Sequence, residues 1–309
     1  NALGNMRLLQ HFNDAWFAQA QGRSTQLHLW VPPTPGDSGV TIGAAWMFAH
    51  LVGAPRGEAM THAFYCGDAP APDDIADALK ADDIASTAIG HIATPEGRDA
   101  VADLMAFMVA QGGIIALYQG AAETGPRALG HRSILGNPCD PATRERLNAR
   151  VKYREAIRPL APMATLEAAQ EYFELLEGAD DANYNAYNYM VLTAQSKPHA
   201  RDKIPAVIHA DGTGRIQIVR AEDDPLTHAY LKALGHHIGV ELSVNTSFNV
   251  AGPIAQTPQQ AVETLRRSAG LDVVLMVAGD GAVTAAWHGG GRDSGRFKGW
   301  LSDWRARAS

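Results

Sequence analysis

Cysteine is scarce in this chain of 309 residues, and long apolar runs are missing from it. The two cysteines, Cys66 and Cys139, lack metal-ligand spacing, so they predict neither a zinc site nor a disulfide framework. No run of 18 apolar residues occurs, so we expect no membrane span. The twelve histidines include no HxxxH pair. These absences together favour a protein of the reducing cytoplasm.

The balance of charge limits the partners further. There are 26 Lys and Arg residues against 33 Asp and Glu residues, which gives a net charge of −7 and a pI near 5.9. Domains that bind nucleic acid usually have a pI above about 9, so we expect small-molecule ligands and no nucleic acid. An apolar content of 46% predicts a globular protein with a core, and the length allows about two domains.

One segment of this acidic chain is strongly basic. Residues 127–158 contain eight of the 26 basic residues against three acids, a local balance of +5, so the remainder of the chain sums to −12. Guanidinium groups bind phosphate oxygens bidentately, and a lysine adds a point charge. The segment therefore predicts a compact anionic ligand.

Two interpretations apply to different cations of this basic segment. A solvated helix face is the simpler interpretation for Arg144, Arg146 and Arg150. The remaining candidates are Arg127, Lys152 and Arg158, of which Arg127 follows Pro126 and Arg158 precedes Pro159, where the backbone is held in a fixed shape.

Two further polar segments are candidate binding sites. Asn245 to Asn249, with the sequence NTSFN, follow the expected strand 240–244, and the carboxyl end of a strand is where open α/β sheets bind ligands. Ordinary turn chemistry is the alternative. Asp37, in the sequence GDSG, either ligates a cation or caps the helix that follows.

Apolar periodicity and turn residues predict alternating helices and strands. Helices are expected over residues 40–52, 73–80, 101–109, 140–152, 165–178 and 257–268. Strands are expected over residues 27–31, 114–118, 189–193, 206–209, 215–219, 240–244 and 273–277. This order indicates an α/β fold with an open twisted sheet. In the tail, Phe297, Trp300 and Trp304 are expected to pack on the body of the protein.

Five motifs resemble the O-carbamoyltransferase family, which includes NodU-like nodulation-factor enzymes and antibiotic-tailoring enzymes. They read PPTPGDSGVTIGAA, GPRALGHRSI, VKYREAIRPLAP, IPAVIHADGTGRIQIV and VNTSFN, and they follow the family's order along nearly the whole chain. Residues 120–127 read GAAETGPR where the family usually has GRMEFGPR, so one arginine and one aromatic residue are absent.

The resemblance implies two domains. Residues 1–65 are expected to be the C-terminal part of a Kae1-like domain of the actin and sugar-kinase ATPase class, and residues 66–93 a linker. Residues 94–280 are expected to form a YrdC-like α/β domain that binds carbamoyl phosphate and ATP, followed by a tail over residues 281–309. Since the chain starts with Asn1 and the family's metal-binding histidines lie upstream, we expect it to be the second half of a longer enzyme or to pair with a separate N-terminal chain.

The resemblance also implies an activity. Carbamoyl phosphate would be activated with ATP and Mg²⁺ to carbamoyl adenylate, and the carbamoyl group then transferred to a hydroxyl of a secondary-metabolite acceptor beside a metal, expected to be Fe²⁺. The residues that match the family's grip on carbamoyl phosphate are Arg127, Lys152, Arg158, Asn245 and Ser247. Those that match its ATP and adenylate contacts are Arg154, Arg215 and Asn249, and Asp37 matches a metal ligand. The family resemblance also allows a homodimer.

Two other functions stay open at this point. A threonylcarbamoyl system that modifies tRNA would share both domain types, although the charge of −12 outside the basic segment argues against a tRNA-binding surface. A non-catalytic subunit that binds carbamoyl phosphate or nucleotide is the second alternative.

Overall fold

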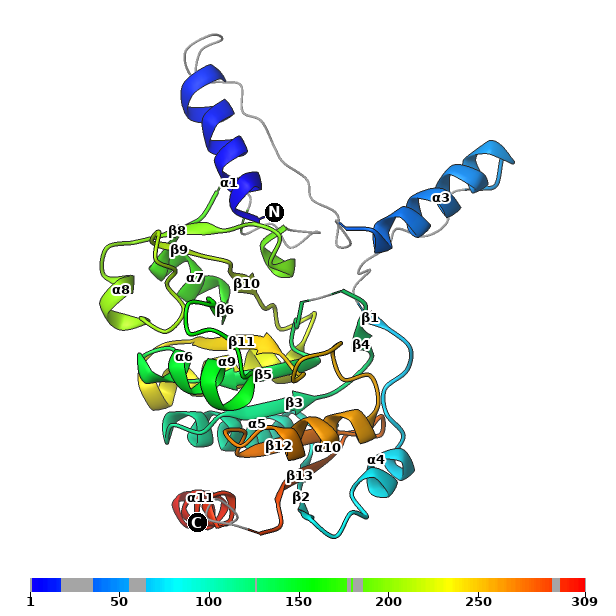
Figure 1. Ribbon diagram of the computed structural model, residues 1–309, viewed down its shortest axis with the longest axis vertical. Helices are drawn as coiled ribbons and strands as arrows, with labels where there is room; N and C mark the ends of the chain where they lie inside the picture. Colours follow the sequence, from blue (N-terminus) through cyan, green and yellow to red (C-terminus); the bar gives the residue numbers. More distant parts are fainter. Residues whose placement is uncertain are drawn as a thin grey trace.

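A computed structural model of the chain is shown in Figure 1. The residues that the structure describes are 2–17, 36–55, 65–125, 127–176, 179, 186–290 and 295–308. The expected strand 27–31 lies outside them. None of the helices in the described part is both long and apolar enough to cross a bilayer.

Within the described residues, eight strands form one mixed, open sheet in the order β10-β6-β11-β5-β3-β12-β13-β2. In chain order these strands are β2 (Ile84–His91), β3 (Ile115–Tyr118), β5 (Arg132–Gly136), β6 (Ala161–Ala164), β10 (Gln217–Ile218), β11 (Leu242–Ser247), β12 (Val273–Val277) and β13 (Ala282–His288). The pairs β10–β6 and β12–β3 are parallel and the other neighbours are antiparallel. The predicted α/β class with an open sheet is confirmed.

Both faces of the sheet are covered, because successive side chains of a strand point to opposite faces. Ile115 and Leu117 of β3 belong to one core, whereas Ala116 and Tyr118 belong to the other. The first core is closed by the helices α5 (Pro95–Ala110), α9 (Pro225–Ile238) and α11 (Arg296–Ala308). The second is closed by α4 (Pro72–Ala78), η2 (Leu147–Val151), α7 (Leu166–Tyr172), α8 (Ala200–Lys203) and α10 (Pro258–Arg267).

Smaller elements complete the described part. Short strands β1 (Tyr65–Cys66) and β4 (Ala122–Glu123) pair with each other, and β7 (Phe173–Glu174), β8 (Ala194–Ser196) and β9 (Thr213–Gly214) form a third sheet. The remaining helices are α1 (Ala2–Gln10), η1 (His11–Phe17), α3 (Ser38–Leu51), α6 (Ala142–Arg146) and η3 (Ala186–Tyr189). In Figure 1, α1 and α3 lie at the end of the molecule opposite α11, and α3 stands away from the sheet.

Three short predictions of secondary structure were wrong. Residues 189–193 do not form a strand, since Tyr189 ends the helix η3, and residues 206–209 form a turn after α8. Both segments are largely buried, and a short buried apolar run reads alike in a strand, a helix or a turn. The helix that begins after Thr165 ends at Tyr172 rather than at residue 178, because Phe173 and Glu174 pair with β8.

The sheet extends past the limits expected for its domain. β2 lies inside the expected linker 66–93, and β13 lies inside the expected tail 281–309. The two strands nevertheless pair over their whole length, and they are the last two strands on one side of the sheet, with β2 outermost. Strand β2 alternates half-buried and exposed residues, which is a weak apolar signal typical of an edge.

The expected docking of the tail is confirmed. Phe297 of α11 is 1% exposed, and its ring centroid lies 4.7 Å from that of Trp287 on β13. Trp300 is also buried, and the indole Nε1 of Trp304 donates a hydrogen bond of 2.6 Å to the Asp103 carboxylate on α5. Helix α11 is therefore part of the folded body.

We predict that Phe297→Ala lowers the free energy of unfolding by about 3–5 kcal/mol, the usual cost of truncating a buried aromatic side chain. Urea denaturation followed by circular dichroism measures this loss. The control Arg305→Ala changes an exposed residue of the same helix and should stay within about 0.5 kcal/mol of wild type. Equal midpoints for Phe297→Ala and wild type would show that α11 does not stabilise the fold.

Candidate anion-binding site

The ends of four strands bring the predicted site residues together where β11 ends and β5, β6 and β10 begin, and we call this end of the strands the sheet edge. Ser247 at the carboxyl end of β11 pairs with Ser133 at the start of β5, and Asn245 pairs with Ala161 at the start of β6. Strand β10 runs parallel to β6, so Arg215, just before β10, reaches the same edge. The loops that carry Arg127, Lys152 and Asn249 adjoin these strand ends.

Lys152 is buried against the loop that follows β11. Its Nζ donates to the carbonyl oxygen of Ser247 at 2.5 Å, to the Ser247 Oγ at 3.2 Å, to the carbonyl oxygen of Asn249 at 2.9 Å and to the Asn249 Oδ1. Burial, reinforced by repulsion from Arg154, lowers the pKa of Lys152 to about 7, although the surrounding oxygens favour the charged form. The structure thus places Lys152 directly against the NTSFN segment.

Three arginines lie close enough to Lys152 or to one another to interact electrostatically. Burial lowers the pKa of Arg127, and burial together with repulsion from Arg158 lowers that of Arg154. The pKa of Arg215 falls to about 10 because of burial and of repulsion from Arg127 and Arg154. We call Arg127, Lys152, Arg154 and Arg215 the cationic cluster.

Hydrogen-bonding capacity is left over in this cluster. Within the described part of the chain, the Arg154 Nη2 and the Arg215 Nε are buried and have no partner. The Asn245 Oδ1 is buried without a partner as well, while its Nδ2 donates to the Ala128 carbonyl at 3.0 Å and to the Gln217 Oε1 at 2.9 Å. Unsatisfied buried groups are costly, so a ligand with both acceptors and donors would satisfy this edge of the sheet.

Two predicted site residues are not brought into the buried cluster. Arg158 has a side chain that is 61% exposed and pairs with Glu155 at 3.5 Å, although its charge still reaches Arg154. Asp37 is exposed at the N-cap position of α3, where its side chain makes no capping hydrogen bond. No group of three His, Cys, Asp or Glu side chains that could hold a metal occurs among the described residues. These residues alone therefore do not fit the expected iron, and its ligation by Asp37 stays a prediction.

Sequence reasoning missed the residues that hold the loop containing Arg127. Glu123 is 2% exposed, and its Oε1 accepts backbone N–H bonds from Leu129 at 2.7 Å, His131 at 3.1 Å and Arg132 at 3.2 Å. A buried glutamate four residues before the predicted arginine was the available signal, but sequence alone does not reveal burial.

Arg132 is a second missed residue, and it is a structural cation. It is 1% exposed, it lies over the ring of Tyr118 at 3.7 Å, and it donates to the carbonyls of Gln119, Gly120 and Ala255. Arg146, predicted to be solvated, is instead half-buried and donates to the Gly112 carbonyl at 2.9 Å. Part of the basic segment thus serves the fold rather than a ligand.

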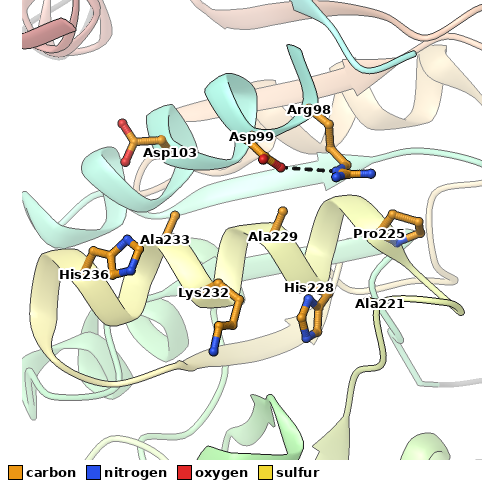
Figure 2. A pocket seen from close by; sticks show the side chains of 10 residues that line it. All are labelled: Arg98, Asp99, Asp103, Ala221, Pro225, His228, Ala229, Lys232, Ala233 and His236. Carbon is orange, nitrogen blue, oxygen red and sulfur yellow. Dashed lines mark hydrogen bonds and ion pairs between the residues drawn. The ribbon is translucent and has the colours of Figure 1, made fainter. Parts of the chain in front are cut away.

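A groove of about 480 Å³ between α5 and α9 contains none of the predicted site residues. Figure 2 shows His228, Lys232 and His236 on α9 and Asp99 and Asp103 on the neighbouring helix α5. Its charges are already compensated, since Arg98 pairs with Asp99 and Lys232 with Glu241. The cationic cluster is the better candidate for an anion.

Comparison with known proteins places this chain in a family. Residues 106–280 match the model of the carbamoyltransferase C-terminus, so the chain belongs to the carbamoyltransferase family. It is 33% identical over 237 residues to the nodulation protein NolO of Bradyrhizobium diazoefficiens, covering 76% of this chain and 41% of NolO. It is 34% identical over 226 residues to the nodulation protein U of Rhizobium tropici, covering 72% and 34%. The chain thus spans less than half the length of these relatives.

A more distant likeness exists to a solved structure, full-length HypF in its phosphate- and nucleotide-bound form. The sequence identity is 15%, the TM-score is 0.36, and the match covers 73% of this chain and 34% of HypF. This structural similarity is too low to support any conclusion about the site.

The pKa of Lys152 predicts how anion binding depends on pH. A bound anion favours the protonated lysine, so binding above pH 7 takes up a proton, and the dissociation constant of sulfate should rise by up to about tenfold per pH unit between pH 7 and 9. Below pH 7 the lysine is already protonated, and this dependence disappears. Titration calorimetry with sulfate, which does not titrate in this range, measures the effect. Lys152→Met should flatten the profile, and a slope that survives in this variant would assign the proton to another group.

Proposed function

We propose that this chain is the carbamoyl-activating part of an ATP-dependent O-carbamoyltransferase. It would bind carbamoyl phosphate and ATP, form carbamoyl adenylate with release of phosphate and pyrophosphate, and deliver the carbamoyl group to a hydroxyl of a small-molecule acceptor of secondary metabolism. The observation that carries the proposal is the cationic cluster at the sheet edge of a carbamoyltransferase-family chain.

The electrostatics of the cluster support a substrate with several negative charges. No neighbouring acid counteracts the lowering of the pKa of Lys152, Arg127 or Arg215. Carbamoyl phosphate and the triphosphate of ATP repel each other unless cations neutralise them, and reactions of phosphoryl groups depend mainly on such positioning and charge stabilisation. A preformed group of one buried and three half-buried cations meets that requirement.

The hydrogen-bonding groups support a carbamoyl substrate in particular. Its phosphate and carbonyl oxygens would accept from the buried nitrogens of Arg154 and Arg215, and its amide would donate to the buried Oδ1 of Asn245. An anion without any donor, such as sulfate, would leave the Asn245 oxygen unsatisfied. Ser247 and Asn249 would then lie beside the ligand. Their side-chain oxygens also accept hydrogen bonds from Lys152 and hold it in place.

The chemical need for ATP follows from the electrophile. Hydrolysis of carbamoyl phosphate would release inorganic phosphate and leave carbamate, which is unreactive towards hydroxyls. Attack of a carbamate oxygen on the α-phosphorus of ATP, with loss of pyrophosphate, then gives carbamoyl adenylate, in which AMP is a good leaving group. Attack of the acceptor hydroxyl on the carbamoyl carbon then yields the carbamate ester and AMP. The chain's cations would stabilise the charge that develops on the phosphates in the first step.

The proposed enzyme also needs a further segment, in the same polypeptide or in a separate chain. Helix α3 presents large apolar side chains to solvent, with Trp46 60%, Phe48 67% and Leu51 74% exposed. A helix that is apolar on all sides is normally buried. The part of the longer relatives that this chain does not span is the proposed cover for α3 and the proposed source of the remaining ligands for a metal at Asp37.

We predict that Arg127→Ala reduces formation of carbamoyl adenylate by at least about 100-fold, the scale of losing one contact to developing charge. Pyrophosphate release that depends on both ATP and carbamoyl phosphate is the measurement, made on the complete enzyme. Arg144→Ala, an exposed arginine of the same basic segment, should stay within about twofold of wild type.

Three outcomes of this assay would reject the proposal. Arg127→Ala that releases pyrophosphate at the wild-type rate removes the cluster from the chemistry. A wild-type enzyme that binds both substrates but releases no pyrophosphate is a binding subunit. Pyrophosphate release that requires threonine, bicarbonate and tRNA instead of carbamoyl phosphate identifies a threonylcarbamoyl system.

We also predict that the exposed side chains of α3 make this chain associate when it is purified alone, because contiguous apolar surface drives association. Light scattering at increasing concentration should show less association for Trp46→Ser combined with Phe48→Ser. Trp16→Ser is the control, since Trp16 is similarly exposed (57%) but lies on η1. Unchanged association of the double variant would count against α3 as a contact surface.

A further inference from the structure

The helix that leads into the cationic cluster ends in an unusual turn. Helix α6 continues as the π-helix η2, and the Lys152 N–H bonds to the Leu147 carbonyl five residues back. The Asn148 carbonyl, which an α-helix would pair with residue 152, accepts instead from the Arg154 N–H at 2.9 Å. Single π turns inside helices often occur at functional sites, and this one sets the directions of both Lys152 and Arg154.

The Asn148 side chain occupies the centre of that turn. It is fully buried, and its Oδ1 accepts a hydrogen bond of 2.7 Å from the Arg154 Nε. Its Nδ2 donates to the Arg158 carbonyl at 3.0 Å and to the Ala156 carbonyl at 3.4 Å. One neutral side chain therefore connects the guanidinium of Arg154 to the backbone of the loop 154–158.

The orientation of Arg154 follows from this contact. Its Nε is occupied by Asn148, while its Nη2 is buried and has no partner among the described residues. Because Asn148 is uncharged, it fixes the guanidinium without neutralising it. An aspartate or glutamate at this position would hold the arginine equally well but would cancel the charge that an anion needs.

A second contact fixes the outer side of the same turn. Tyr153 has a φ of 49°, a strained left-handed conformation for a residue other than glycine, and its hydroxyl accepts the Ala269 N–H at 3.1 Å. The Gly270 N–H bonds to the Arg150 carbonyl at 3.0 Å, and a Cβ on Gly270 would lie 2.8 Å from the Arg150 Cβ. The turn is thus held from both sides, and among the residues that the structure describes Asn148 is the one that hydrogen-bonds the Arg154 side chain.

We propose that Asn148 is a positioning residue of the anion site, which acts by holding Arg154 in its charged, ligand-facing orientation. This inference rests on the anion site of the proposed function. Asn148 would touch neither carbamoyl phosphate nor ATP. Its effect on binding passes through Arg154 and is absent when that arginine is absent.

A double-mutant cycle with pyrophosphate as the probe tests this proposal. Calorimetry at a fixed pH measures its dissociation constant for wild type, Asn148→Ala, Arg154→Ala and the double variant. We expect each single variant to weaken binding by about 10-fold or more, the scale of losing one charge-assisted hydrogen bond. In the Arg154→Ala background, Asn148→Ala should change binding by less than about twofold. Asn137→Ala is the matched control, since it removes a turn contact to the Cys139 N–H away from the cluster, and it should leave binding unchanged.

The outcomes separate this inference from the proposed function. If the two effects multiply in the double variant, Asn148 supports the fold in general and the inference is overturned. If Asn148→Ala binds like wild type, the inference is also overturned while the anion site stands. If wild type binds no pyrophosphate, the anion site itself is rejected. Should Asn148→Ala fail to fold by circular dichroism, Asn148→Ser, whose hydroxyl can satisfy a nearby carbonyl but does not reach Arg154, completes the same cycle.

Discussion

Burial of several like charges at one edge of a sheet is the constraint on which the rest of the site depends. Lys152, Arg154 and Arg215 lose hydration, and Arg154 repels both of the others, so each has a lowered pKa. Such an arrangement is unfavourable in an empty protein. It persists because oxygen atoms of the surrounding loops compensate part of the lost hydration. The positive charge and the buried donors that remain without a partner are available to an anionic ligand.

The loops that supply this compensation are themselves fixed by buried polar side chains. Glu123 collects three backbone N–H groups of the loop after Arg127, Arg132 donates to carbonyls on two loops, and Asn148 joins Arg154 to the backbone of the next loop. Each of these residues satisfies backbone groups that no strand or helix pairs. The result is a site whose geometry is set before any ligand arrives, which is how charge stabilisation becomes effective in catalysis.

The helices near the two ends of the chain differ in how much of their apolar surface is buried. The sheet is covered on both faces, and α11 closes one core through Phe297. Helix α3 shows the opposite pattern, with a row of large apolar side chains in solvent. Since the chain spans 41% of NolO and 34% of nodulation protein U, the proposed reaction divides naturally into activation at the sheet edge and transfer at a site that needs the segment covering α3.

Much of this protein was determined by local sequence. The alternation of apolar runs with turn residues predicted the α/β class, the strands at 114–118 and 273–277 and the helix 257–268, because periodicity records which face of an element is buried. The family motifs and the basic segment predicted the residues of the cationic cluster. Local sequence is sufficient for the helices and strands, since each depends on residues that are neighbours along the chain, whereas the residues of the cluster, which are distant in the chain, were predicted through the family's motifs.

Only the tertiary structure decided which cations gather at the proposed anion site and which support the fold. The sequence does not reveal that burial beside Tyr118 makes Arg132 structural or that a carbonyl of Gly112 holds Arg146. Strand β13 joins the sheet by pairing with β12, and β2 joins it by pairing with β13, which their own weak periodicity did not reveal. The role of Asn148 depends on a π turn and on an arginine six residues away. Burial and long-range pairing arise when distant segments meet. The fold therefore decided which of these residues are buried and which partners they contact.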